Sequence, residues 1–341
     1  MLTGILRRVG RRLLASIPAL FGVVVVTFVL MRVLPGDPAV FFSSGPSAGK
    51  EEIEELRRSM GLDRPIPVQL VRYLGEVATG NLGRSMTTGQ PVISDMTRRL
   101  PASLELTCTA LFIALMFSIP LGVAAALRPG TAIDHVVRML CTLGVCVPTF
   151  VSGLLLIYAF YYLLGWAPDP TGRIDIFASA PPDITGFFLI DFALKGDWEG
   201  WMAAFSQLLL PACTMALFVL APLARMTRAS MLAVLGSDFI RTAHAMGLSR
   251  LRIIVAYALR NALLPVLTIT GIVFSTMLGA NVLVEKVFSW PGVASYALDA
   301  LLASDYAPVQ AFVLLMAMIF VMVNVTIDVL YGIADPRVSV A

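Results

Sequence analysis

Hydrophobic residues form six long runs along the chain, separated by polar connections. An α-helix needs about 20 apolar residues to cross the roughly 30 Å of a bilayer, and each run is close to or above that length. The runs are Leu13–Leu34, Ser103–Leu127, Val136–Leu164, Ser206–Leu223, Leu263–Val284 and Ala311–Ile333. This pattern predicts an all-α membrane protein with six transmembrane helices.

Two of the polar connections are unusually long. Residues 35–102 follow the first run, and residues 165–205 follow the third. The stretch KEEIEELRRSMGL in the first connection places Ile53, Leu56 and Met60 at helical spacing. A connection of this length with its own amphipathic helix is typical of a folded insertion. We therefore expect an N-terminal arm with the first helix at 1–34, an insertion at 35–102 and a five-helix core at 103–341.

Charged residues are distributed asymmetrically between alternate connections. Arginine collects at the N-terminus and in the connections after the second and fourth runs, at Arg7, Arg8, Arg11, Arg12, Arg128, Arg138, Arg225, Arg228, Arg241, Arg250, Arg252 and Arg260. Acidic residues prevail in the connections after the third and fifth runs, at Asp169, Asp175, Asp183, Asp191, Asp197, Glu199, Glu285, Asp299 and Asp305. Because cytoplasmic loops carry the excess of Lys and Arg, we predict that both termini are cytoplasmic and that the insertion is external.

The composition fits a surface that faces lipid. The 341 residues are 58% hydrophobic and 14% charged, whereas soluble domains are about one quarter charged. Two histidines are too few for a metal site. The four cysteines match neither a disulfide framework nor metal-binding spacing, so we predict small buried hydrophobic residues at Cys108, Cys141, Cys146 and Cys213.

Features of an enzyme or an ion-coupled carrier are absent from the sequence. Arg32, Glu105 and Asp328 lie near the ends of their runs, and we interpret them as structural groups that pair or reach an interface. No hydrolase or metalloprotease motif occurs. The segment GPSAGK at 45–50 resembles a phosphate loop superficially, but it lacks the first glycine and the final Ser or Thr. We therefore expect no catalytic residues and no bound nucleotide in this chain.

The connection between the fourth and fifth runs, residues 225–262, has the most specific pattern. Ser237 is a typical N-cap residue, and Gly247 suits the left-handed position that ends a helix. Between them Arg241 and His244 share one face, and the opposite face is formed by Phe239, Ile240, Ala243 and Met246. Ser249 is expected to begin a second helix that continues to Pro265.

The pattern fits two kinds of contact. Small residues at Ala243, Ala245 and Gly247 would allow the backbone of another protein to approach this helix closely. A basic helix lying on anionic lipid headgroups fits equally well. Periodicity by itself leaves both alternatives open.

The segment from Arg241 to Pro265 resembles the cytoplasmic coupling motif of the permeases of ATP-binding-cassette (ABC) importers. That motif contains Glu-Ala-Ala, a glycine three residues later and a downstream Leu-Pro; here the corresponding residues are Thr242, Ala243, His244, Ala245, Gly247, Leu264 and Pro265. No glutamate opens the motif in this chain, so an ion pair from that position to an ATPase is not implied.

Five further passages resemble the branch of this family that imports dipeptides and oligopeptides. They are LPGDP at 34–38, MGLDRP at 60–65, GNLGRS at 80–85, FSWPG at 288–292 and DPR at 335–337. The six passages follow one another in order over nearly the whole chain, so the sequence is identified as a member of this family.

The resemblance implies an inner-membrane permease subunit that pairs with a second, homologous permease around a central path. It implies an external substrate-binding protein and two ATPase subunits that bind ATP and Mg, contacted by the segment around Asp238, Arg241, His244 and Gly247. Asn281 and Asn324, which are polar and lie within spans, are candidates to line the path, although hydrogen bonding between helices is an equal alternative. Lipid is an expected partner and nucleic acid is not.

The substrate is the property of this chain that the sequence specifies least. The resemblance favours short peptides, and nickel chelates, glutathione and opines are alternatives within the family. A membrane receptor or scaffold without transport activity is the alternative from another class of protein, but it does not account for one short, capped helix on a small cytoplasmic face.

Overall fold

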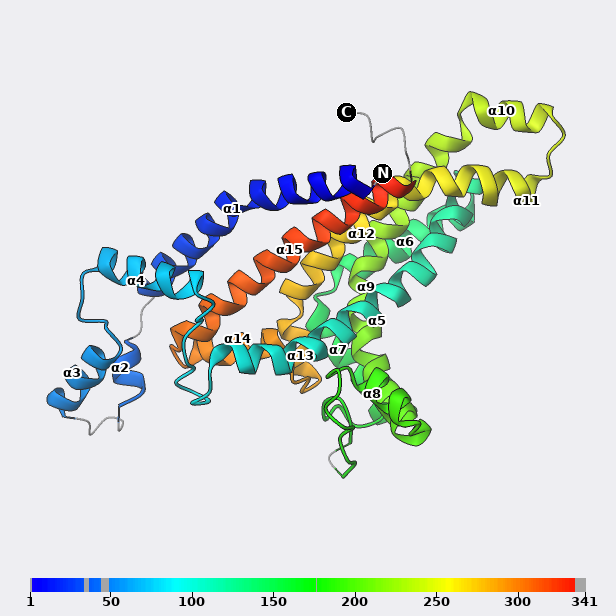
Figure 1. The fold of residues 1–341 in the computed structure, drawn as a ribbon. Coiled ribbons are helices and arrows are strands. Elements are labelled where there is room, and N and C mark those ends of the chain that lie inside the picture. Colours follow the sequence, from blue (N-terminus) through cyan, green and yellow to red (C-terminus); the bar gives the residue numbers. More distant parts are fainter. Residues whose placement is uncertain (1, 34–36, 44–48, 176, 335–341) are drawn as a thin grey trace. The chain divides into compact units, whose positions relative to one another are not determined.

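The structure, a computed structural model, describes residues 2–33, 37–43, 49–175 and 177–334 (Figure 1). Within these ranges the chain is mainly helical, and its strand-type pairing is limited to an isolated bridge between Arg84 and Pro91. Three sequence features lie wholly or partly outside the described residues: positions 34–36 of the LPGDP passage, positions 45–48 of the GPSAGK segment and the terminal DPR passage. The all-α prediction is confirmed for the described part of the chain.

The chain divides into two compact units. The first unit comprises residues 1–103 and 291–322, and the second comprises residues 104–290 and 323–341. Residues 35–102 thus share a unit with the first helix and with the segment that begins at Pro291. Two long helices, α5 (Val92–Leu127) and α15 (Tyr306–Ala334), begin in the first unit and end in the second.

In the first unit the insertion forms three short helices beyond the end of α1 (Leu2–Val33), as Figure 1 shows. They are α2 (Pro38–Phe41), α3 (Lys50–Ser59) and α4 (Ile66–Ala78). The predicted amphipathic helix is confirmed as α3, in which Ile53 and Leu56 are half-buried and the glutamates are exposed. Asp37 accepts a hydrogen bond from the Ala39 amide and also pairs with Arg57, so it joins α2 to α3.

The GNLGRS passage forms a loop that is fixed to the start of α15. Asn81 Oδ1 accepts a hydrogen bond from the Gly83 amide at 3.0 Å. The buried Ser85 hydroxyl donates to Asp305 at 2.8 Å, and the Thr87 amide donates to the same carboxylate oxygen at 3.0 Å. Beneath this loop, Val92 and Met96 of α5 pack with Tyr296 of α14 (Val293–Leu302). Burial raises the pKa of Tyr296 to about 12.

The second unit is built around α9 (Trp198–Leu235), which packs with the helices before and after it in the chain. The other elements are α6 (Ala132–Cys146), α7 (Thr149–Leu156), the π-helix η1 (Ile157–Leu163), α8 (Phe188–Lys195), α10 (Asp238–Ala245), α11 (Arg250–Arg252), the π-helix η2 (Ile253–Leu259), α12 (Arg260–Ala280) and α13 (Val282–Val287). At Gly122 on α5 a Cβ would lie 2.6 Å from Thr227 Cβ, so only glycine permits this approach of α5 to α9. Close contact at small residues is typical of helices packed in a membrane.

Five helices are long and apolar enough to span a membrane, and a bent pair adds a sixth candidate. The five are Val9–Val33, Val92–Leu127, Trp198–Leu235, Arg250–Ala280 and Tyr306–Tyr331. Where the sequence predicted one straight third span at Val136–Leu164, the structure has Ala132–Gly144 and Thr149–Leu163 at 100° to each other. Pro148 precedes α7 and holds Val147 in an extended conformation, so the helix cannot continue through this position.

Two ion pairs, each with a buried carboxylate, hold the second unit together. Glu105 of α5 accepts from Arg173 at 2.6 Å and from the Leu189 amide at 2.8 Å. Burial lowers the pKa of Arg173, and the nearby Glu105 opposes that shift. Asp134 of α6 accepts from Arg228 of α9 through two bonds, at 2.7 and 2.8 Å. The structural interpretation of Glu105 is therefore confirmed, whereas the prediction that all four cysteines are buried is wrong, because Cys108 and Cys146 are exposed.

Candidate functional site

The predicted short helix is present as α10, between the end of α9 and the start of α11. Its backbone enters from Ser237, which is extended, and the amides of Ile240 and Arg241 donate to the Ser237 carbonyl at 3.2 and 3.3 Å. Ser237 thus occupies the N-cap position. Its hydroxyl donates to the Val234 carbonyl at 2.5 Å, however, and does not cap α10.

The C-terminal end of α10 is closed by a Schellman motif. Gly247 has φ of +73°, the left-handed conformation that the sequence predicted for it. Its amide donates to the His244 carbonyl at 3.0 Å, and the Leu248 amide donates to the Ala243 carbonyl at 3.3 Å. These two bonds satisfy carbonyls that a helix end leaves without partners. They also fix the direction in which the chain leaves α10.

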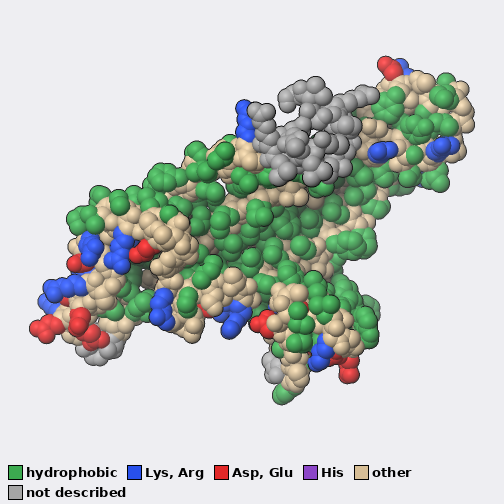
Figure 2. Space-filling model, viewed as in Figure 1, with side chains coloured by type: hydrophobic (Ala, Val, Ile, Leu, Met, Phe, Trp, Pro, Cys, Tyr) green, Lys and Arg blue, Asp and Glu red, His purple; other side chains and the backbone are tan. Residues whose placement is uncertain are grey.

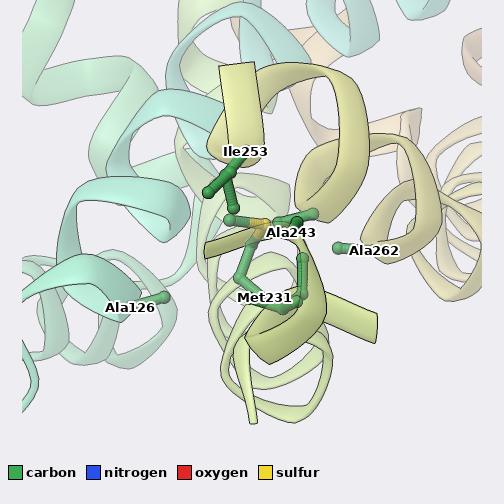
Figure 3. Close-up of a cluster of buried hydrophobic side chains, with 7 residues drawn as sticks. Ala126, Met231, Ala243, Ile253 and Ala262 are labelled. Carbon is green, nitrogen blue, oxygen red and sulfur yellow. The ribbon is translucent and has the colours of Figure 1, made fainter. Parts of the chain in front are cut away.

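One side of α10 is buried in the second unit. Ile240 and Ala243 are 2% and 3% exposed. They pack in a hydrophobic cluster whose other buried members are Ala126, Met231, Ile253, Ala258 and Ala262. Figure 3 shows Ala243 next to Met231 and Ile253 in this cluster. Burial of one side chain of this kind stabilises a fold by about 1.5–3 kcal/mol, so α10 is attached firmly to the ends of the neighbouring helices.

Burial changes the expected role of Ala243. We expected Ala243 to let another backbone approach, but its side chain faces the interior of this chain and Ala245 and Gly247 are the exposed small residues. Phe239 and Met246, expected on the apolar face, are 45% and 72% exposed. On that face Ile240 and Ala243 belong to the core cluster, whereas Phe239 and Met246 lie outside it.

The outer surface of α10 is mixed in character. Its exposed residues are Asp238, Phe239, Arg241, Thr242, His244, Ala245, Met246 and Gly247. Figure 2 shows hydrophobic and basic side chains together over α10 and α11. Arg241 and Asp238 form a pair at 3.3 Å, with both side chains more than three-quarters exposed, so the pair adds little stability. His244 Nδ1 lies 2.9 Å from the Ile240 carbonyl, which holds its ring along the helix.

The second predicted helix runs further than expected. Ser249 precedes α11 as predicted, and the helical backbone continues through η2 and α12 to Ala280. Pro265 therefore lies inside α12 and does not end it. Leu264, its neighbour, accepts a hydrogen bond from the Tyr331 hydroxyl of α15 at 2.7 Å. This bond joins α15 to α12 one residue before the proline.

The two candidate path residues lie on different elements of the second unit. Asn281 joins α12 to α13 and is fully buried, and neither its Oδ1 nor its Nδ2 has a hydrogen-bond partner among the described residues. Asn324 lies on α15 and is half-buried. The structure does not place either of them beside α10.

Sequence reasoning missed the residues that anchor α10. Met231 and Ile253 lie in the connection at 225–262, and neither carries a local signal of this role. Leu248 had a signal, because a hydrophobic residue directly after a C′ glycine is part of the Schellman pattern. The Asp134–Arg228 pair was also missed, since its partners lie on helices whose packing the sequence does not specify.

Comparison with known families extends over nearly the whole chain. Residues 5–107 match the N-terminal region of a membrane component of binding-protein-dependent transport systems, and residues 118–340 match the inner membrane component of such systems. The chain therefore belongs to the family of binding-protein-dependent transport system inner membrane components, which are multi-pass permease subunits of ABC importers and not enzymes.

Individual relatives are similar over their full length. The di/tripeptide transport system permease protein DppB of Pseudomonas aeruginosa (strain UCBPP-PA14) is 42% identical over 330 residues, covering 97% of this chain and 98% of the relative. The dipeptide transport system permease protein DppB of Escherichia coli (strain K12) is 39% identical over 341 residues, covering 99% of each. A putative peptide transport system permease protein of Brucella abortus (strain 2308) is 38% identical over 328 residues, covering 96% and 97%. The family resemblance in the sequence is thus confirmed.

Proposed function

We propose that this chain is one of the two permeases of an ABC importer for dipeptides and short oligopeptides. The names of the relatives above support the peptide substrate over nickel chelates, glutathione or opines, because each of them is described as a peptide or dipeptide permease. Substrate would pass between this chain and a second, homologous permease. Asn281 and Asn324 are our candidates for residues near that path.

The observation that carries the proposal is the attachment of α10. Its inner side is fixed to α9, η2 and α12 through Ile240 and Ala243, while its outer side leaves Phe239 and Met246 exposed. Exposed apolar side chains on a polar, basic surface are typical of a protein-binding site. A helix held in this way transmits a displacement of its outer side to the spans, because the Schellman motif and the core cluster leave it little freedom to tilt.

We assign the outer side of α10 to an ATPase subunit. Two such subunits would bind ATP and Mg and drive the permeases between inward-open and outward-open states, and a separate binding protein would deliver substrate from outside. This assignment requires α10 and both termini to be cytoplasmic, as the distribution of arginines predicts. It also requires the insertion to be external, where it would contact the binding protein or shield the entrance.

The test uses the complex assembled from this chain, its second permease and the ATPase subunits. We expect vanadate-sensitive dipeptide uptake that continues when a protonophore removes the proton gradient and ATP is held constant. Phe239→Asp should release the ATPase subunits during purification and abolish uptake. An aspartate in the first turn of a helix is compatible with the helix dipole, so this variant should keep α10 folded.

The matched control is Phe177→Asp, which replaces the same residue type at a position 92% exposed and remote in sequence from α10. It should leave both ATPase association and uptake unchanged. Association that survives Phe239→Asp would show that another surface binds the ATPase, and uptake driven by a proton gradient without ATP would rule out the importer class.

A further inference from the structure

The π-helix η2, Ile253–Leu259, separates α11 from α12 in the second unit. Its hydrogen bonds span one residue more than those of an α-helix, so each turn holds more residues. Helices of this kind are rare and occur mostly as interruptions of α-helices, frequently at functional sites. Two of its residues belong to the core cluster that also holds α10. The π-helix therefore stands between α10 and the span that α12 forms.

The buried residues of this segment show where the extra residue of the π-helix is accommodated. Ala258 and Ala262 are fully buried and lie four residues apart, as on one face of an α-helix. The next buried residue towards α10 is Ile253, which precedes Ala258 by five residues. Five residues is the spacing of π-type hydrogen bonds. Ile253 thus reaches the cluster, where Figure 3 shows it with Ala262, because η2 is a π-helix.

The same sequence also encodes an α-helical stripe that the structure does not use. One face of an α-helix repeats at spacings of three, four and seven residues. Counted back from Ala258, these spacings give Val255, Ile254 and Leu251. All three are apolar, yet Val255 and Leu251 are 53% and 72% exposed, and Ile254 is half-buried beside the cluster. An α-helix in place of η2 would turn this stripe towards the cluster and Ile253 away from it.

Two neighbouring isoleucines make the packing of the two forms similar. Ile253 occupies the cluster in the π form, and Ile254 takes its place in the α form, so a side chain of the same size is buried in either. The exchange moves the contact by one residue, which on an α-helix is a rotation of about 100°. An element with two discrete packings of similar free energy changes state when a partner favours one of them.

A polar side chain stabilises the π form. Where π bonding returns to α bonding, two successive carbonyls compete for one amide. Asn261 Nδ2 donates to the Tyr257 carbonyl at 2.7 Å and so supplies an additional donor near this junction. The other π-helix, η1, buries none of its seven residues. A change of register in η1 would therefore exchange no packed side chain, which distinguishes it from η2.

We propose that η2 is a conformational switch that converts to an α-helix when α10 is displaced, exchanging Ile253 for Ile254 in the core cluster. Ala243 of α10 packs with Ile253 in this cluster, so a displacement of α10 weakens the contact that favours the π form. The conversion rotates α11 relative to α12. Only the trigger rests on the proposed function, in which an ATPase subunit moves α10.

Cysteine labelling of the assembled complex distinguishes the two forms. Alanines replace the native cysteines, and Leu251→Cys, Ile253→Cys or Ala256→Cys is then introduced singly. A water-soluble maleimide should react slowly with Ile253→Cys in the resting complex and at least fivefold faster after vanadate trapping. The rate for Leu251→Cys should fall. Ala256→Cys is the control, because Ala256 is exposed and would lie opposite the stripe in an α-helix.

The rise at Ile253→Cys is the decisive result, because a bound ATPase can by itself shield Leu251. An unchanged labelling rate at Ile253→Cys in a vanadate-trapped complex would overturn the switch. The importer function would still stand, because vanadate-sensitive uptake by the same complex tests that function separately.

A second experiment needs only the purified full-length chain. Asn261→Leu removes the donor to the Tyr257 carbonyl, so it should raise the labelling rate of Ile253→Cys at least threefold without ATPase or nucleotide. The matched control is Thr270→Val, which removes another bond from a side chain to a carbonyl four residues earlier on α12, that of Thr270 to Val266. It should leave the rate unchanged. Equal rates in Asn261→Leu and Thr270→Val would contradict a balance between two forms.

Uptake by the complex tests whether the exchange is needed for transport. Ile254→Thr and Ile254→Val are matched in shape, but only threonine would carry a hydroxyl into the cluster in the α form. We expect both variants to retain the melting temperature and the ATPase subunits, and Ile254→Thr to take up dipeptide at least fivefold more slowly. Equal uptake by the two would overturn the switch. Absence of uptake by the unaltered complex with ATP present would instead contradict the proposed function.

Discussion

Two short helices in different units of this protein end in the same three residues, Met-Gly-Leu. In α3 the glycine is Gly61, with φ of +68°, and in α10 it is Gly247, with φ of +73°. Both ends form a Schellman motif: the Leu62 amide donates to the Arg57 carbonyl at 3.0 Å, as the Leu248 amide does to that of Ala243. The local sequence therefore produces the same helix end in two unrelated surroundings.

Their packing differs sharply. No residue of α3 is fully buried, and its clearest tertiary tie is the pair between Arg57 and Asp37, whose side chains are 43% and 31% exposed. By contrast, α10 buries Ile240 and Ala243 in a cluster that reaches four other helical elements. The two helices share the same C-terminal signal, but α3 is held loosely in the first unit and α10 is held firmly in the second. The transmission of force that we propose for α10 would require the second arrangement.

The substitution with the largest expected effect on the packing of α10 is Ala243→Asp. The substitution places a carboxylate in the apolar cluster, and an uncompensated buried charge costs on the order of 3–5 kcal/mol. We expect α10 to detach, the melting temperature in detergent to fall and uptake to be lost. Ala245→Asp is the matched control, because Ala245 is exposed on the same helix. Ala245→Asp should leave the melting temperature unchanged and reduce uptake only through the proposed ATPase contact. Equal melting temperatures for the two variants would contradict the burial of Ala243.

The second comparison uses the two glycines. Gly61→Val and Gly247→Val each force a β-branched residue into the left-handed region, at a cost of about 1–2 kcal/mol. No heavy atom lies within 4 Å of a Cβ at Gly247, so strain there comes from the backbone and not from a clash. We expect Gly247→Val to abolish uptake with ATP hydrolysis uncoupled or the ATPase lost, and Gly61→Val to reduce uptake less.

Asparagine tolerates the left-handed conformation, so Gly247→Asn should restore most of the uptake lost in Gly247→Val. A helix that merely lies on lipid headgroups predicts another order of effects, in which Gly247→Val is mild and neutralisation of Arg250 and Arg252 is worse. Uptake and ATP hydrolysis measured for these variants side by side decide between the two.

The smallest effect is expected for the charge pair that joins α2 to α3. Asp37→Asn removes the charge, while asparagine keeps the cap on α2 because it is an equally good N-cap residue. The loss of a partly exposed ion pair should lower the free energy of unfolding by about 0–1 kcal/mol. High salt should reduce the difference further, since it screens the pair already present in the unaltered chain. A loss as large as that of Ala243→Asp, measured by thermal unfolding, would show that α3 is held as firmly as α10.

Much of the fold follows from local pattern. Apolar length identified the segments that form the five long helices, and the glycine at 247 and the charge order of residues 50–59 predicted α10 and α3. The structure departs from the predicted helices at two prolines, one of which interrupts a helix while the other does not. Pro148 separates α6 from α7, because a residue before proline is driven out of the helical region. Pro265 lies inside α12 without ending it.

The sequence by itself determined the class of protein, the helical segments and the position of α10, because family motifs, hydrophobic length and glycine conformation are properties of neighbouring residues. Only the tertiary structure decided which side of α10 is available, since that depends on Met231 and Ile253 meeting Ala243 from other helices. Likewise it alone brought Asp134 of α6 to Arg228 of α9. These residues lie on different helices and far apart in the sequence, so no local pattern connects them.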